Sequence, residues 1–232
     1  GIQYLRQGLD ILIKNGINVG TTNPLISHTD VWGDPLGDNK IEYRDESGQS
    51  IVLKLKTAPD ISTGILDQCE LGPYNLLILG SPSKWRSRWN TFWGTGIGQK
   101  VSMIAPCSVL IAREKKNIAK KKGHLIIVNS STNSFKSAYQ DAILARHCKL
   151  PATLMAVATN ERDRNSLEKK SIQLQKKLKL KNIKFKKVIM KIGDPVKNIL
   201  DESKNFYIVS VSEPEPGRIK RFFSENIALN VM

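Results

Sequence analysis

Apolar residues in the second half of the chain follow two alternating patterns. Runs of strand length occupy 124–129, 152–158, 183–192 and 206–211. Apolar positions recur at helical spacing over 134–145, 167–180 and 195–204. Ser134 is expected to cap the first of these helices, and Gly193-Asp194-Pro195 opens the last. Strands that alternate with helices predict an α/β fold, a Rossmann-like parallel sheet with helices on both faces.

The first half of the chain has a longer and less regular pattern. Residues 2–15 have helical spacing and end at Gly16, whereas 20–49 is dense in Gly, Pro, Asn and Asp. This predicts a helix followed by a loop, with only a short extended piece at 41–44. The remaining predicted elements are a strand at 51–56, a helix from Pro59-Asp60 to about 72, a buried strand at 75–79, a helix from 94 to 104 and a strand at 108–113.

The two halves share one order of features. Ala58-Pro59-Asp60, then an Ile-Leu pair, then an apolar strand recur as Gly193-Asp194-Pro195, Ile199-Leu200 and 207–211. Such an internal repeat predicts two copies of one domain. We place the first copy at 1–114, without its opening third, a basic linker at 115–123, and the second copy at 124–232, without its last strand.

Charge is distributed unevenly between these copies. The chain has 36 Lys and Arg against 21 Asp and Glu, a net charge of +15, and residues 1–114 hold 11 of each. The excess therefore belongs to the second half, where ten lysines lie within 169–191. The run is interpreted either as a solvated face or as a surface that attracts an anionic membrane. Nucleic acid is disfavoured because Phe185 is the only aromatic residue within the run.

Other chemistry is sparse in this sequence. No apolar run approaches the ~20 residues of a membrane span. The three cysteines are widely spaced and form no ligand pattern with the histidines, which predicts reduced thiols, a cytosolic protein and no metal site. His124 and His147 are expected at the surface or at helix ends rather than as bases. No nucleophile–base pattern appears, so a non-enzymatic protein is predicted.

Two glycine-containing turns follow the strand at 75–79. Together with Ala105-Pro106-Cys107-Ser108-Val109-Leu110-Ile111 they resemble the universal stress protein family. The resemblance implies that the first copy holds the phosphates of ATP or AMP. The alternative is that these are turn glycines with no ligand, because Ser83 stands where the family has glycine. The implied nucleotide-binding residues are Gly80, Ser81, Ser83, Gly94, Thr95 and Gly98.

The second copy departs further from the same pattern. Asn129, followed by Ser130, stands where the resemblance implies Asp, and Ser212-Glu213 replaces the glycine turn. A carboxylate at a phosphate position repels the ligand. The second copy is therefore predicted not to bind a nucleotide.

Tandem copies of this domain occur as cytosolic tails of bacterial ion and amino-acid transporters. The pattern Ala58, Asp60, Gly64, Pro73, Asn75, Leu76, Gly80 and Trp85 is also similar to the soluble region of cation–chloride cotransporters. The resemblance implies a regulatory or assembly domain that is cytoplasmic and membrane-associated through a larger chain. Its expected partners are a transmembrane part and a second copy in a homodimer. The alternatives are a free-standing nucleotide-binding stress protein and a basic nucleic-acid-associated protein.

A tryptophan-rich segment lies between the two glycine turns. Trp85, Trp89 and Trp93 are spaced by four residues, with Arg86 and Arg88 between them. On a helix this spacing places the three rings on one face beside cations, which favours a docking surface for a membrane interface or a protein. The alternative is that the rings cover the sheet or a domain interface.

Overall fold

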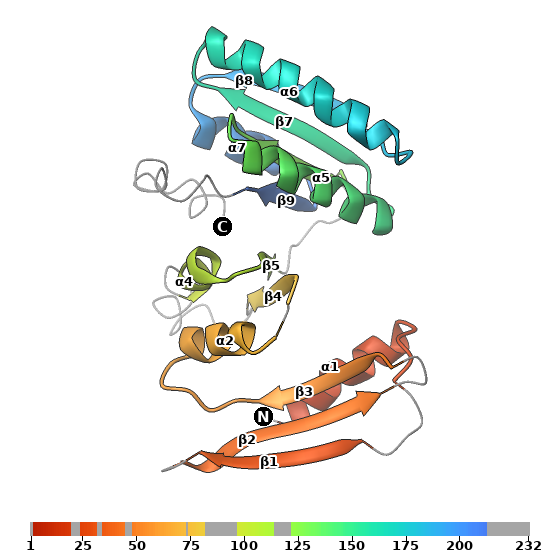
Figure 1. The fold of residues 1–232 in the computed structure, drawn as a ribbon, viewed down its shortest axis with the longest axis vertical. Helices are drawn as coiled ribbons and strands as arrows, with labels where there is room; N and C mark the ends of the chain where they lie inside the picture. Colours follow the sequence, from red (N-terminus) through yellow and green to blue (C-terminus); the bar gives the residue numbers. More distant parts are fainter. Residues whose placement is uncertain are drawn as a thin grey trace. The chain divides into compact units, whose positions relative to one another are not determined.

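The computed structural model describes residues 2–19, 24–31, 34–44, 48–72, 74–81, 97–113 and 122–212. Two compact units, Gly1–Ala112 and Arg113–Met232, make up the chain (Figure 1). The basic linker predicted at 115–123 lies almost wholly outside the described residues.

Unit 2 is built on a four-stranded parallel sheet in the order β8-β7-β6-β9. The strands are β6 (His124–Val128), β7 (Ala152–Ala158), β8 (Lys187–Ile192) and β9 (Ile208–Val211). The register aligns Ile126 with Leu154 on one side and with Ser210 on the other. Every residue of β6 and β7 is buried, as expected for the central strands of a parallel sheet that is covered on both faces.

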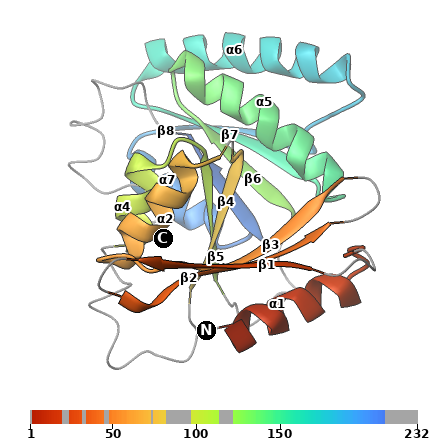
Figure 2. The ribbon, with the colours of Figure 1, turned by 60° about the horizontal axis from the view of Figure 1, so that its bottom comes forward.

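Helices cover both faces of this sheet. The first two, α5 (Thr132–His147) and α6 (Glu161–Lys179), pack on the face that contains Ile126 and Leu154, whereas α7 (Pro195–Ser203) packs through Ile199 on the opposite face. Figure 2 shows α5 and α6 together on one side. The predicted parallel α/β sheet with helices on both faces is confirmed.

Two helix starts in unit 2 differ from the prediction. The cap of α5 is Ser131, whose side chain accepts a hydrogen bond from the Ser134 N–H, so Ser134 lies inside the first turn. The N-cap of α6 is Asn160, and this helix begins six residues before the predicted start at 167 because its first turn is polar. Apolar spacing marks only the buried part of a helix, so it misses a polar first turn.

Unit 1 contains an antiparallel sheet that the sequence analysis missed. Its strands are β1 (Leu25–Val31), β2 (Asp34–Arg44) and β3 (Ser50–Leu55), in the order β1-β2-β3, and α1 (Ile2–Lys14) lies against β3. The prediction of a loop at 20–49 was therefore wrong. Pro35 and Gly37, which favoured the loop, fall where the β1–β2 register is irregular, so the missing proline N–H interrupts no regular ladder.

Among its described residues, the rest of unit 1 combines two helices with a two-stranded sheet. Strands β4 (Leu76–Ser81) and β5 (Ser108–Arg113) pair with each other, and α2 (Ile61–Glu70) packs against α4 (Ile97–Ile104). A small core contains Leu79, Ile97 and Val101. The first of these strands was predicted to be buried, but Ile78 is 60% exposed because one face of the strand is uncovered in this unit.

Candidate functional site

The carboxyl ends of β6 and β9 form the candidate ligand edge of unit 2, because open parallel sheets bind ligands there. The Asn129 side chain accepts a hydrogen bond from the Ser131 N–H at 2.9 Å. Its own N–H donates to Oγ of the buried Ser134 at 3.0 Å, and the Ser134 N–H donates to Ser131 Oγ at 3.1 Å. This turn therefore satisfies three of its backbone N–H groups with its own side chains.

Two further contacts cover the same turn. Oγ of Ser212, at the end of β9, donates to the Ser134 carbonyl at 3.4 Å. The Lys170 ammonium from α6 donates to the Ser130 carbonyl and lies 5.9 Å from the centre of the Phe135 ring. Asn129, Ser130 and Ser212 thus lie at the same edge, where they form hydrogen bonds within unit 2. Glu213 lies outside the described residues.

The end of β7 adds negative charge to this edge. Asp163, in the first turn of α6, accepts hydrogen bonds from the Thr159 hydroxyl and from the Asn160 amide, the latter at 3.1 Å. A helix N-terminus normally attracts an anion. Here the Asp163 carboxylate already places negative charge in the first turn of α6, which opposes a phosphate at this helix N-terminus.

Unit 1 has exposed backbone at Gly80, near the end of β4. A Cβ atom added to Gly80 would have no heavy atom within 4 Å, so the backbone at this position is accessible. A Cβ atom on Gly98, in the first turn of α4, would lie 3.2 Å from Cδ1 of Ile111. Close packing against Ile111 therefore explains a glycine at this position.

Of the other residues predicted in unit 1, the structure describes only Ser81, which ends β4. The remainder fall outside the described residues: Ser83, Gly94 and Thr95 of the nucleotide site, and Trp85, Trp89, Trp93, Arg86 and Arg88 of the docking surface. Both sites remain predictions.

A buried polar network lies on the α5 side of the unit 2 sheet, and sequence analysis did not identify it. His124 is 1% exposed, so its predicted surface position was wrong. Its Nε2 lies 2.5 Å from Oγ of Ser210 on β9, and the Ser210 hydroxyl also lies close enough to the half-buried Asp141 carboxyl from α5 to affect the pKa of that carboxyl. Period-two alternation places His124 on the same face as Ile126, whose neighbour on β9 is Ser210.

Burial shifts the proton affinity of both ends of this network. It lowers the pKa of His124 to about 4 and raises the pKa of Asp141 to about 6, although the Ser210 hydrogen bond opposes the second shift. The single Ser210 proton can go to only one neighbour at a time. When Asp141 is ionised, Ser210 donates to the carboxylate and His124 Nε2–H donates to Ser210; protonation of Asp141 allows both bonds to reverse.

This order of groups does not suit nucleophilic catalysis. In a Ser-His-Asp triad the histidine lies between the other two, so that it can remove the serine proton. Here Ser210 occupies the middle position, and Nδ1 of His124 is buried without a hydrogen-bond partner among the described residues. The arrangement is suited to coupled protonation inside the core rather than to attack on a substrate.

The buried Cys69 also lacks the features of a reactive thiol. All three cysteines are free, and burial together with the neighbouring Cys107 thiol raises the pKa of Cys69. A raised pKa keeps the Cys69 thiol protonated and weakly nucleophilic. Within the described ranges, no three His, Cys, Asp or Glu side chains gather as metal ligands. No helix of the described part of the chain has the length and hydrophobicity needed to cross a membrane.

Comparison with known proteins identifies the fold. No family model matches the chain, and no curated protein matches it in sequence. A universal stress protein from Archaeoglobus fulgidus superimposes with a TM-score of 0.56 over 77% of this chain at 15% sequence identity. The match spans 63% of that protein, less than two thirds of its length. The α/β fold of this chain is therefore of the universal-stress type.

Proposed function

We propose that the chain is a non-enzymatic regulatory and assembly module of universal-stress fold, the cytosolic part of a membrane transporter. The observation that carries the proposal is the occupied ligand edge of unit 2, where Asn129, Ser131 and Ser134 bond to one another. A nucleotide would have to break these bonds and overcome the charge of Asp163. Unit 2 keeps the sheet of its fold type without a free ligand edge, which fits a scaffold better than a nucleotide-dependent protein.

The assembly role is supported by the edge of the sheet at β9. This strand pairs with β6 on one side, and among the described residues no strand pairs with its other side. An unpaired strand edge presents N–H and C=O groups to any strand that approaches. We propose that β9 pairs with a strand of a second copy, which would make the module a homodimer.

Nucleotide titration by calorimetry tests the closed edge. We expect that neither ATP nor AMP binds to unit 2 of the unmodified chain. Tight, saturable binding that Asn129→Ala abolishes and Gly80→Val leaves intact would refute the proposal. Sedimentation velocity, with and without ATP, then tests assembly; a dimer whose mass does not depend on nucleotide is expected, and a monomer at all concentrations would contradict it.

The reading frame of the full gene tests whether the chain is part of a transporter. The proposal expects the reading frame to continue upstream of the Gly1 codon into several apolar segments of about 20 residues each. A reading frame whose start codon lies directly before Gly1 would refute this part and favour a free-standing protein.

A second function, nucleotide binding by unit 1, is favoured by the open backbone at Gly80. Glycine after a strand lets N–H groups approach a phosphate closely. The same titration decides this alternative, because saturable ATP binding that is lost in Gly80→Val and retained in Asn129→Ala would assign the nucleotide to unit 1.

A further inference from the structure

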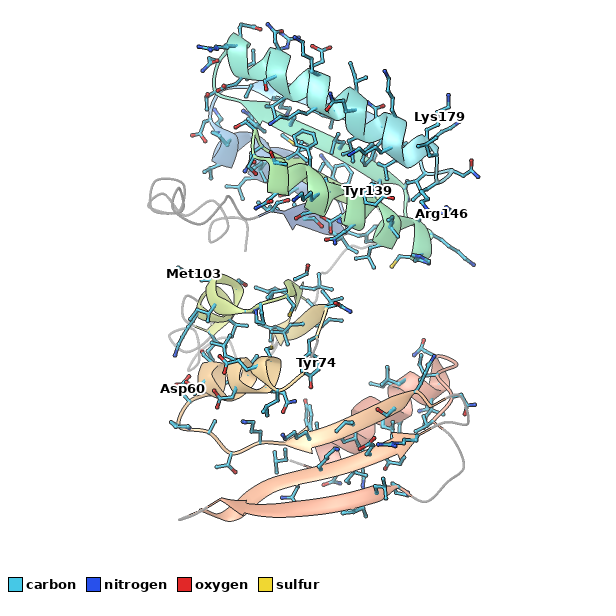
Figure 3. All side chains as sticks on the ribbon, viewed as in Figure 1. Asp60, Tyr74, Met103, Tyr139, Arg146 and Lys179 are labelled. Carbon is cyan, nitrogen blue, oxygen red and sulfur yellow. The ribbon has the colours of Figure 1, made fainter. Side chains whose placement is uncertain are left out.

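One edge of the unit 2 sheet carries a dense group of cations. It lies where β7 and β8 begin and where α5 and α6 end, opposite the edge that holds Asn129. Six exposed side chains define this cationic edge: Arg146, Lys149, Lys179, Lys181, Lys184 and Lys186. Arg146 donates to the Lys181 carbonyl, which joins the ends of the two helices, and Figure 3 shows Arg146 and Lys179 at the same end of the unit.

The positive charge of the cationic edge is not neutralised locally. In the part of the chain that the structure describes, none of the six side chains forms an ion pair. The sequence between Asp163 and Asp194 contains a single acid, Glu168, and 142–160 contains none. The field of this edge therefore extends into solvent, where it attracts anions over roughly 8 Å at physiological salt.

Stabilisation of the helices accounts for only part of this charge. Cations in the last turn of a helix interact favourably with its dipole, and this explains Arg146 and Lys179. The effect fades within one turn. Lys184 and Lys186 lie beyond α6 in the segment that leads to β8, so helix stability gives no reason for their charge.

Exposed apolar side chains accompany these cations. Leu180, directly between Lys179 and Lys181, is 85% exposed, and Leu144, near the end of α5, is 41% exposed. A purely ionic partner gains nothing from an exposed leucine. A lipid interface does, because the leucine enters the acyl boundary while the lysine ammonium groups reach the headgroups.

Among the described residues of the lysine run, no exposed aromatic ring is present of the kind that a nucleic-acid surface normally uses. Single-stranded nucleic acids stack their bases on exposed aromatic rings. Phe185, the aromatic residue within the lysine run, packs against the core of α5, α6 and the sheet instead. We propose that the cationic edge docks unit 2 onto an anionic lipid surface, with Leu180 inserted among the headgroups.

This inference goes beyond the proposed function and does not depend on it. A free-standing protein with this edge would bind anionic lipid equally well. Failure of the nucleotide and reading-frame tests would leave the lipid proposal intact, and failure of the lipid test would leave the others intact.

Vesicle co-sedimentation of the full chain tests the proposal. The vesicles contain phosphatidylcholine with or without about 30% phosphatidylserine, at about 0.1 M salt. The test variant is Lys179→Gln with Lys181→Gln and Lys184→Gln. The matched control removes the same charge near the starts of α5, α6 and α7, with Lys136→Gln, Arg162→Gln and Lys197→Gln, all exposed in the structure.

Binding is expected only to the vesicles that contain phosphatidylserine. Each lysine near an anionic surface contributes about a fivefold factor, so the test variant should lose about 100-fold in partition coefficient. The control variant should lose much less, and Leu180→Ser alone should lose about tenfold. Hydrogen exchange of the β6 amides checks that each variant retains the fold.

Three results would overturn the proposal. The first is no binding of the unmodified chain to phosphatidylserine vesicles. The second is an equal loss in the test and control variants, which would make binding a consequence of net charge alone. The third is tighter binding to a single-stranded RNA of about 20 nucleotides, unchanged by Leu180→Ser, which would assign the edge to nucleic acid.

Discussion

Replacement of Asp141 by asparagine should reveal a pH dependence of stability that the unmodified protein conceals. The pKa of His124 is about 4 in the folded protein against an ordinary value of 6.5, so the histidine costs stability as pH falls from 6.5 towards 4. The pKa of Asp141 is about 6 against an ordinary 3.8, so the stability that its proton provides is lost as pH rises from 3.8 through 6. The two effects have opposite signs over nearly the same range.

The size of each effect follows from the shifts. One pKa unit corresponds to about 1.4 kcal/mol, so His124 alone should lower the free energy of unfolding by about 2 kcal/mol between pH 7 and pH 5. Asp141 alone should raise it by about 1 kcal/mol over the same interval. Asp141→Asn should therefore lose about 2 kcal/mol between pH 7 and pH 5 from this network, and His124→Gln should gain about 1 kcal/mol.

Hydrogen exchange of the β6 and β7 amides is the suitable assay, because these buried strands report the unfolding of unit 2 alone. Carboxylates elsewhere titrate alike in all three proteins, so the comparison rests on differences from the unmodified chain. Equal pH slopes in the unmodified protein and in Asp141→Asn would refute the reasoning, as would a variant slope of the opposite sign.

Three other predictions concern stability. Gly123→Ala should destabilise unit 2 by several kcal/mol because its Cβ would lie 1.9 Å from the Pro151 carbonyl oxygen at φ +38°; Gly16→Ala, at φ +87° with open space, is the matched control and should cost about 1 kcal/mol in thermal unfolding. Leu154→Ala, in the fully buried centre of β7, should cost about 3 kcal/mol, measured by urea unfolding. Asp60→Ala removes the cap of α2 and should cost about 1 kcal/mol, seen as faster amide exchange in that helix.

The sheet of unit 2 could be predicted because its central strands carry a direct signal. Strands β6 and β7 are buried on both faces, which requires an unbroken apolar run, and helices with apolar faces separate the strands. Pro195 after the capping Asp194 also marks the start of α7 in the sequence itself. These elements could be predicted because each depends on the residue types within its own segment.

The antiparallel sheet of unit 1 could not be predicted in the same way. Glu42, near the end of β2, is only 8% exposed, and its carboxylate is paired with Lys40 at 2.8 Å and with Arg44 at 2.6 Å. Charged residues and asparagines are typical of loops, so the sequence of this strand taken alone predicts a loop. Only the placement of β2 between two partner strands shows that their backbone groups pair and that the charges compensate one another.

The position of the candidate ligand edge could be predicted from the sequence, but whether its polar atoms are free to bind a ligand could not. Polar residues after strands indicate where a parallel sheet binds ligands, and Asn129, Ser130 and Ser212 lie there. Whether their atoms are free depends on contacts with α5 and α6, such as the bond from Lys170 to the Ser130 carbonyl, which is 40 residues distant in sequence. His124 was missed because it begins an apolar run, and its partners come from two other elements.

The two edges of the unit 2 sheet differ in charge and in hydrogen bonding. At the carboxyl edge, hydrogen bonds within the turn and the charge of Asp163 oppose a phosphate ligand. At the amino edge, the six side chains of the cationic edge form no ion pair among the described residues, and Leu180 is exposed. Because helices run antiparallel to the strands that they follow, their C-terminal ends gather at the amino edge, where basic side chains are favourable for the helices. The charge beyond the helix ends and the exposed leucine both fit the anionic surface that we propose as the partner.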